Sequence, residues 1–185
     1  MSPSSEPPEA ELTVTSAAQY RALGHPLRHR LLFALGQHPA TISQLATALG
    51  SHKGNIAHHL KVLRDAGLVA VTETRQVRGG TEQYYQRTAR LLRFPGEQGT
   101  AHAGVMLQAV GDEMATADGE PLLVLRNIRL TADQALQLAG MLNDLVAGLD
   151  DAGDGAARYG VLVGLYQPRP PDQPRPPGPD GSSSP

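Results

Sequence analysis

Apolar residues in the first half of the chain recur every three or four positions, which is the spacing of one face of a helix. Leu23, Leu27 and Leu31 follow this spacing, but Gly24-His25-Pro26 interrupts it. Proline cannot lie inside a helix, although it fits the first turn of one. The pattern therefore predicts one short helix that ends near Leu23 and another that begins near Pro26.

Two further short helices are predicted between residues 41 and 67. Thr41 and Gln44 have the spacing of a capping box, and Gly50 marks the end of the helix that they begin. The next helix has three apolar residues on one face, Ile56, Leu60 and Leu63. Gly67 ends this helix. Two short helices joined by a brief turn are a helix-turn-helix candidate.

The hydrophobic period then changes to that of β-strands. Residues 68–74 and 83–88 are rich in Val, Thr and Tyr, and the pair Gly79-Gly80 between them is suited to a hairpin turn. A β-hairpin directly after a helix-turn-helix is a wing. The pattern therefore predicts a winged helix-turn-helix domain over residues 15–94.

In the second half of the chain, the apolar pattern predicts a helix near residues 103–115 and then a small β-α-β unit. The predicted strands are residues 122–130 and 159–166, and Thr131 is the expected N-cap of the helix 131–149 between them. A unit this thin cannot bury its apolar faces alone. We therefore expect residues 95–167 to be a dimerisation region and a candidate site for a small-molecule effector. The predicted fold class is α+β.

The two ends of the chain are poor in large apolar residues. Residues 168–185 hold eight of the 15 prolines, so this tail is expected to be disordered with polyproline character. Residues 1–14, which begin acidic and rich in Pro and Ser, are also expected to be disordered. Neither a signal peptide nor an apolar run long enough to span a membrane is recognised, so a cytoplasmic, non-membrane protein is expected.

Charge is distributed unevenly along the chain. The formal net charge is −2, but residues 15–94 carry +8 and residues 95–185 carry −7. A basic front half is a reason to look for a polyanion site there, although surface arginines that only solvate a helix face would give the same count.

The strongest local motif is the run from Ala57 to Val69, AHHLKVLRDAGLV, with Leu45 to Gly50 before it and Tyr84-Tyr85 in the returning strand. Together with the run RALGHPLRHRLL from Arg21 to Leu32, it resembles the ArsR-type winged helix-turn-helix regulators of bacteria. The resemblance covers roughly residues 16–90. It implies a DNA-binding transcription regulator whose wing reaches toward an adjacent groove.

A recognition helix buries one face and offers the other to base edges in the major groove. Lys53 can donate to guanine, and Asn55 and His58 can contact bases or phosphates, whereas Lys61 and Arg64 are placed for backbone contacts. Gly54 allows DNA to approach closely, where the family usually has a small polar residue. The wing contributes two arginines at its expected tip. The full set of predicted DNA contacts is Lys53, Gly54, Asn55, Ala57, His58, Lys61, Arg64, Arg75 and Arg78.

Metal and catalytic chemistry are not expected. The chain has no cysteine, and neighbours such as His58 and His59 point about 100° apart on a helix, so they cannot easily hold one ion together. An acidic loop at Asp150, Asp151 and Asp154 could hold Ca²⁺, but its spacing is not that of an EF-hand and a solvated turn is the better interpretation. No nucleophile and base are brought together, so we expect no enzyme activity and no cofactor.

The sequence therefore predicts a homodimeric regulator, most simply a repressor without metal sensing, that binds a near-palindromic operator in double-stranded DNA. Two needs favour the dimer: the apolar rear helix needs a partner, and a two-fold operator needs two recognition helices. The alternative is a winged-helix protein-interaction module that does not bind DNA. The sequence does not identify the operator, the regulated genes, the effector or the exact dimer interface.

Overall fold

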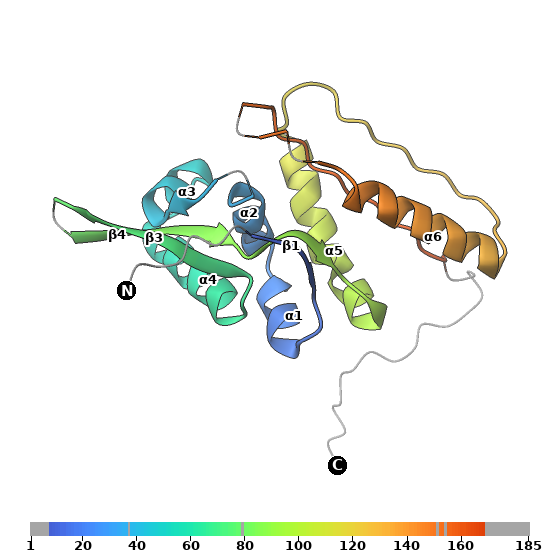
Figure 1. The fold of residues 1–185 in the computed structure, drawn as a ribbon, viewed down its shortest axis with the longest axis horizontal. Coiled ribbons are helices and arrows are strands. Elements are labelled where there is room, and N and C mark those ends of the chain that lie inside the picture. The colour runs from blue at the N-terminus through green and yellow to red at the C-terminus, as the bar shows by residue number, and fades with distance from the viewer. Residues whose placement is uncertain (1–7, 37, 79, 151, 154, 169–185) are drawn as a thin grey trace, which may run out of the picture. The chain divides into compact units, whose positions relative to one another are not determined.

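The computed structural model describes residues 8–36, 38–78, 80–150, 152–153 and 155–168 (Figure 1). These residues fall into two compact units that divide between Arg126 and Asn127.

The first unit contains the four predicted short helices. Helices α1 (Ala17–Leu23) and α2 (Pro26–Ala34) are separated at Gly24-His25, as the proline at the start of α2 predicts. Helices α3 (Ile42–Ala48) and α4 (Lys53–Asp65) form the predicted helix-turn-helix. A capping box of Thr41 and Gln44 begins α3.

The predicted wing is a hairpin of strands β3 (Val69–Val77) and β4 (Gly80–Arg87). Together with the short strand β2 (Ala40–Thr41), they form an antiparallel sheet in the order β2-β4-β3. Both hairpin strands are longer than the sequence predicted, because the ladder continues to the pair Val77 and Gly80. The helix-turn-helix and this wing confirm the predicted fold class.

The N-terminal segment differs from the prediction. Residues 1–14 were expected to be disordered, but Glu9–Thr13 form strand β1, which pairs in parallel with strand β5 (Ala89–Arg93) directly after the wing. Val14 is fully buried, and Glu11 forms an ion pair with Arg93. The prediction is therefore wrong for residues 9–14, because a strand far along the chain supplies the partner. Residues 1–7 lie outside the described residues.

Helix α5 (Gly96–Met114) begins earlier than predicted and packs against α1 and α2. Its residue Ala109 is fully buried. The first compact unit includes α5 and ends at Arg126, beyond the boundary predicted at residue 94. The buried cluster of the first unit draws on α1 to α4 and on β3 and β4.

The second unit contains helix α6 (Ala132–Ala147), which begins at the predicted N-cap Thr131. The predicted strands 122–130 and 159–166 are not present: both segments lack regular secondary structure. A strand needs a neighbouring backbone to satisfy its N–H and C=O groups, and the structure pairs neither segment with one. The β-α-β prediction is therefore wrong for this chain. The expected disorder of the tail concerns residues 169–185, which lie outside the described residues.

Candidate nucleic-acid interface

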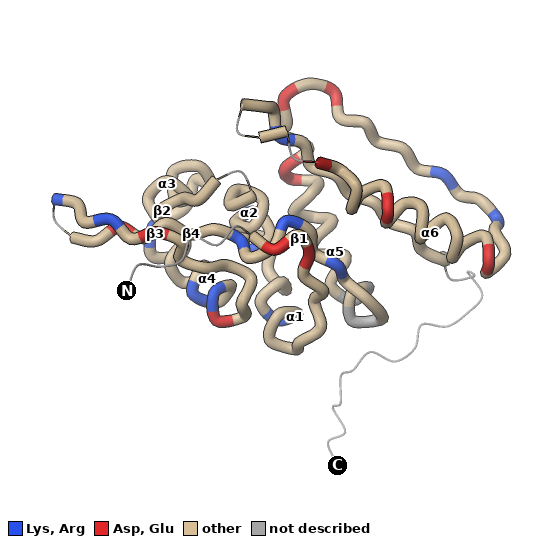
Figure 2. Tube along the Cα trace, viewed as in Figure 1, with Lys and Arg blue, Asp and Glu red and all other residues tan. Residues whose placement is uncertain are grey.

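Lys and Arg residues lie on α4 and along the β3–β4 hairpin (Figure 2). Both elements follow from the local sequence already described: a helix with one apolar face, and a two-strand ladder rich in Thr, Tyr and Val. The predicted contact residues therefore come from two neighbouring elements of the same unit.

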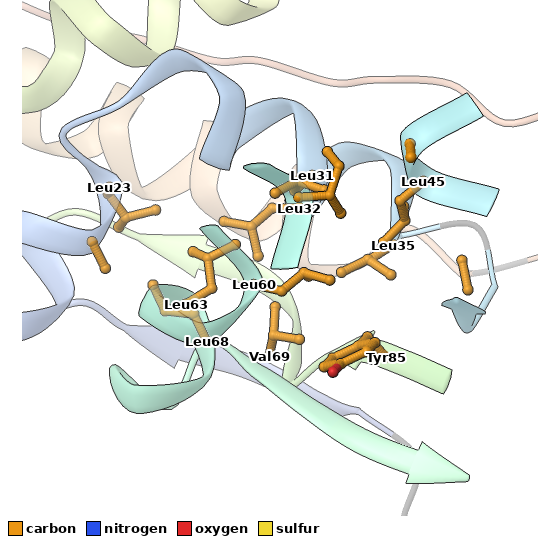
Figure 3. Packing of buried hydrophobic residues seen from close by; sticks show 14 of the residues in the cluster. Leu23, Leu31, Leu32, Leu35, Leu45, Leu60, Leu63, Leu68, Val69 and Tyr85 are labelled. Carbon is orange, nitrogen blue, oxygen red and sulfur yellow. The ribbon is translucent and has the colours of Figure 1, made fainter. Parts of the chain in front are cut away.

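Helix α4 separates its residues cleanly into an inner and an outer side. The inner residues Ile56, Leu60 and Leu63 are buried, and Leu60 and Leu63 point into the cluster shown in Figure 3. On the outer side, Lys53, Asn55 and His58 are exposed. The other predicted contacts on α4 are Gly54, Lys61 and Arg64, which are exposed, and Ala57, which is half-buried. The buried stripe therefore fixes which side chains α4 presents to a partner.

The first turn of α4 is open to an anion. The N-cap residue His52 makes no side-chain hydrogen bond to the helix, and the first turn has no acidic residue. The positive end of the helix dipole therefore coincides with the cationic side chain of Lys53. Asn55 donates from Nδ2 to Ser51 Oγ at 3.0 Å, which holds its amide beside this turn.

Lys61 is paired within its own helix. Its Nζ lies 2.5 Å from Oδ2 of Asp65, one turn further along α4. The hydrogen bond from Lys61 holds the pKa of Asp65 below its usual range. Both side chains are more than half exposed, so this pair is weak and a phosphate could compete with Asp65 for the lysine.

Arg75 does not lie at the tip of the wing, contrary to the prediction. It stands inside β3 opposite Glu82, and its Nε and Nη2 donate to the Glu73 carboxylate at 2.5 and 2.9 Å. Its guanidinium also lies 4.6 Å from the centre of the Tyr84 ring. The hydrogen bond to Glu73 raises the pKa of Arg75 and lowers that of Glu73. The charge of Arg75 is therefore largely balanced within the hairpin.

Arg78 is the arginine at the tip of the wing. It follows Val77, the last residue of β3, and it is exposed. Residue 79, part of the predicted turn, lies outside the described residues. Of the two predicted wing arginines, Arg78 is thus the one placed to reach beyond the hairpin.

The inner side of α4 also carries a polar contact that sequence reasoning did not predict. His59 is largely buried, with 7% of its surface exposed. Its neighbours there are His25 and Arg28, which belong to the start of α2. No local spacing predicts this contact, because Arg28 and His59 are 31 residues apart.

The described residues contain no group of three or more His, Cys, Asp or Glu side chains that could hold a metal ion. The rings of His58 and His59 meet edge to face with centroids 5.3 Å apart. Residues 151 and 154 of the acidic loop lie outside the described part of the chain. Among the described helices, none is long and apolar enough to cross a bilayer.

Part of the chain is similar to known bacterial regulators. Residues 25–71 match the family described as bacterial regulatory protein, arsR family. The HTH-type transcriptional regulator CmtR of Mycobacterium tuberculosis is 48% identical over 78 residues, which are 42% of this chain and 62% of CmtR. The regulator NmtR of the same organism is 34% identical over 65 residues, which are 35% of this chain and 54% of NmtR. The chain therefore spans less than two thirds of either relative.

Among solved structures, the transcriptional repressor BigR from Xylella fastidiosa aligns with a TM-score of 0.32 and 22% identity. The alignment covers 50% of this chain and 81% of that chain.

Proposed function

We propose, from the premise that this chain carries an ArsR-family helix-turn-helix domain, that it is a transcription regulator which binds operator DNA through α4 and the β3–β4 wing. The matched family is one of regulatory proteins and not of enzymes. The observation that carries the proposal is the outer side of α4, where Lys53, Asn55 and His58 are exposed above a fully buried apolar stripe.

In the proposed complex, α4 enters the major groove with its N-terminal turn toward the bases. Lys53 donates to guanine, and Asn55 and His58 contact bases or phosphates. Arg64 and Arg78 contact the DNA backbone or an adjacent minor groove. Lys61 and Arg75 contribute less, because Asp65 and Glu73 already pair with them.

The functional unit is proposed to be a homodimer that binds a near-palindromic operator, because two recognition helices related by a two-fold axis match two half-sites. The second unit is proposed to supply the dimer contact, since its apolar residues are largely exposed in the single chain. The same region is the candidate site for a small-molecule effector. Repression is the simplest mode of action, because a dimer on an operator blocks access to it. An operator of a bacterium lies in the cytoplasm, so that is the proposed location.

Metal sensing is not part of the proposal. Zinc needs convergent thiolates or imidazoles at about 2.0 to 2.3 Å, and the chain has no cysteine. We expect no stoichiometric metal when protein purified without a His tag is assayed. One tightly held zinc per protomer, with release of DNA on its addition, would contradict this part.

The proposal is tested by measuring affinity for a random duplex at increasing salt concentration. If each protomer contacts about three to five phosphates, log K should fall against log salt with a slope of roughly −5 to −9 per dimer. A nearly flat titration favours the alternative function, a winged-helix module that docks on a protein. The internal pairing of Lys61 and Arg75 is the observation on the side of this alternative, because it reduces the free cationic charge.

Two arginines of the wing provide a matched test of the interface. Arg78→Ala should reduce the salt slope by about 0.9 for each phosphate that Arg78 neutralises in the wild-type complex. Arg75→Ala should change the slope less, because Glu73 already balances Arg75. An equal change in both variants would show that the assignment of the wing tip is wrong.

Specificity is tested separately on α4. Lys53→Ala or His58→Ala should reduce the preference for operator over random DNA, by about 1 to 3 kcal/mol where the wild-type side chain binds a base through two hydrogen bonds. Arg78→Ala should weaken binding to operator and binding to random DNA by more similar factors. The operator used is the sequence that the wild-type chain selects from a random pool.

A further inference from the structure

One polar network joins the inner side of α4 to α1 and α2. The Arg28 Nη1 atom lies 3.4 Å from Nδ1 of the largely buried His59. The imidazole of His25, the N-cap residue of α2, lies against that of His59 with ring centroids 4.5 Å apart. The network therefore connects the start of α2 to the helix that is proposed to enter DNA.

Arg28 connects this network to the end of α1. Its Nε donates to the carbonyl oxygen of Ala22, and its Nη2 donates to that of Arg21 at 3.0 Å. Carbonyl groups in the last turn of a helix lack partners within the helix, and a cation there also offsets the negative end of the dipole. A single guanidinium thus ties the C-terminal end of α1 to the middle of α4.

These contacts require neutral imidazoles. A guanidinium only donates, so His59 must accept at Nδ1 and carry its proton on Nε2. Nδ1 of His25 accepts the backbone N–H of Leu27 at 3.1 Å, so it too must be without a proton. Protonation of either ring would replace an acceptor by an N–H that faces another N–H.

We propose that Arg28 and neutral His59 position α4 for DNA binding, and that protonation of the His25–His59 pair releases α4 and weakens the complex. This inference rests on the proposed function, because its consequence is a change in DNA affinity. Arg28 is a positioning residue here: it acts on DNA only through α4.

The surroundings of His59 oppose its protonation. Burial lowers the pKa of His59 most, and the neighbouring His25, Arg28 and His58 lower it further. Burial and then Arg28 lower the pKa of His25. Both effects favour the neutral form of each ring.

The other helices and strands that pack on α4 place no negative charge at His59 that would favour its protonation. Helix α3 has no titratable side chain, and Glu73 and Arg75 of β3 pair with each other. On α1, Arg21 lies with Asp65 of α4 around a separate surface hollow. His29 of α2 donates from Nε2 to Leu23 O at 2.8 Å, a bond that survives protonation of the ring. His102 of α5 acts on His29 and not on His59, and it lowers the pKa of His29 electrostatically.

The proposed network should lower DNA affinity as the pH falls, which is opposite to the usual effect of acidification on DNA binding. Acidification in general adds positive charge to a protein surface beside DNA, which strengthens binding. Release of α4 should instead weaken binding. A decline in affinity on acidification therefore distinguishes the positioning role from simple charge.

The main test compares wild type with His59→Asn, because the asparagine Oδ1 can accept from Arg28 but does not titrate. Operator affinity is measured from pH 7.5 to 5.5 at fixed salt. We expect wild-type affinity to fall by about tenfold for each unit by which the pKa values of free and bound protein differ. The affinity of His59→Asn should remain nearly constant with pH. The control His38→Asn replaces an exposed histidine outside the network and outside the proposed DNA contacts, so it should decline like wild type.

His25→Asn keeps the test decisive if His59→Asn does not fold. Asparagine is among the best N-cap residues, so this variant retains the cap of α2 without a titrating ring. It should show a shallower decline than wild type. Arg28→Lys, which retains the charge but cannot reproduce three directed N–H groups, should bind operator more weakly at pH 7.5.

The free energy of unfolding, measured without DNA over the same pH range, separates the two proposals. The folded pKa values of His25 and His59 are lowered, so their stabilising effect is present above about pH 6.5 and is lost as pH falls through the folded pKa. The loss should be smaller in His59→Asn. If the chain does not bind DNA, but His59→Asn still loses less free energy of unfolding on acidification than wild type, only the proposed function is refuted. Parallel pH profiles in wild type, His59→Asn and His25→Asn would overturn the positioning role.

Discussion

Helices α4 and α6 have similar amphipathic patterns but opposite burial. Ile56, His59, Leu60 and Leu63 of α4 are buried, whereas no described residue of α6 is. Leu145 of α6 is 63% exposed. The difference lies in what surrounds each helix: α4 packs on α1, α2, α3 and β3, while the described second unit holds one helix and extended segments.

This comparison shows that periodicity predicts which side of a helix is apolar but not which chain covers it. Exposed apolar surface costs roughly 25 cal/mol per Å², and large contiguous patches of it are uncommon on monomers. The second unit exposes large apolar residues on α6 and on both flanking segments. A second copy of the chain is the partner that the proposed two-fold operator already requires.

The largest expected effect comes from removing the second unit together with residues 120–126, which lead into it. A chain that ends at Gly119 retains α5 and the buried core of the first unit. We expect it to be monomeric and to bind operator about 10² to 10⁴ times more weakly, because the second recognition helix is no longer tethered to the first. Sedimentation and operator titration measure the two effects.

A chain that ends at Gln167 is the matched control, and it should retain both the dimer and the affinity. If the chain that ends at Gly119 still sediments as a dimer, the interface lies in the first unit, most simply through α1. The comparison of α4 and α6 would then reflect only a loosely packed appendage.

Equivalent leucine substitutions in the two units should differ next most strongly. Leu60→Ala removes a side chain that is 1% exposed, so it should lower the free energy of unfolding by about 2 to 5 kcal/mol. Leu145→Ala should change it by less than about 0.5 kcal/mol at concentrations where the chain is monomeric. Urea unfolding measures both. A large loss in Leu145→Ala under those conditions would mean that its own chain covers α6.

The local signals in the first unit predicted its helices closely, because each signal acts within a few residues. Pro26 begins α2, and the capping box of Thr41 begins α3. Long-range pairing was not predictable in this way. Strand β1 needs β5, and its only local signal is a short alternation around Leu12 and Val14 that the acidic composition obscured.

The candidate site shows the same division. The apolar stripe of α4 predicted the exposure of Lys53, Asn55 and His58, whereas Ala57 is half-buried. Arg75 and Glu73 are two residues apart on one strand and therefore share a face, so their ion pair had a local signal that charge counting overlooked. The contact between Arg28 and His59 had none, since it depends on how α2 packs on α4.

Two identical helix caps sharpen the comparison between the units. The side-chain oxygens of Thr41 and Thr131 each accept the backbone N–H of a glutamine three residues on, and the side-chain oxygen of that glutamine accepts the threonine N–H. Substitution by alanine costs about 0.5 to 2 kcal/mol at such positions. Thr41→Ala should accelerate hydrogen exchange throughout the first unit, because Thr41 is 5% exposed and lies beside the core. Thr131→Ala should affect only amides near the start of α6.

If Thr41→Ala and Thr131→Ala changed hydrogen exchange over equally wide regions, the first unit would not open cooperatively while α6 opens locally. Hydrogen exchange is suited to this test because it reports the free energy of opening at each amide separately.

The smallest expected effect concerns Gly54 of α4, and it tests whether this glycine affects only the stability of the helix or also the close approach of DNA. A Cβ added at Gly54 would meet no atom within 4 Å, and the same is true of Gly140 in α6. Alanine at either site should therefore stabilise its helix by up to about 1 kcal/mol. Gly54→Ala should also weaken operator binding, because the added methyl group lies on the outer side of α4 where DNA is proposed to approach. Gly140→Ala is the control and should leave binding per dimer unchanged. If Gly54→Ala increases stability without any loss of operator affinity, the DNA does not approach α4 closely at this position.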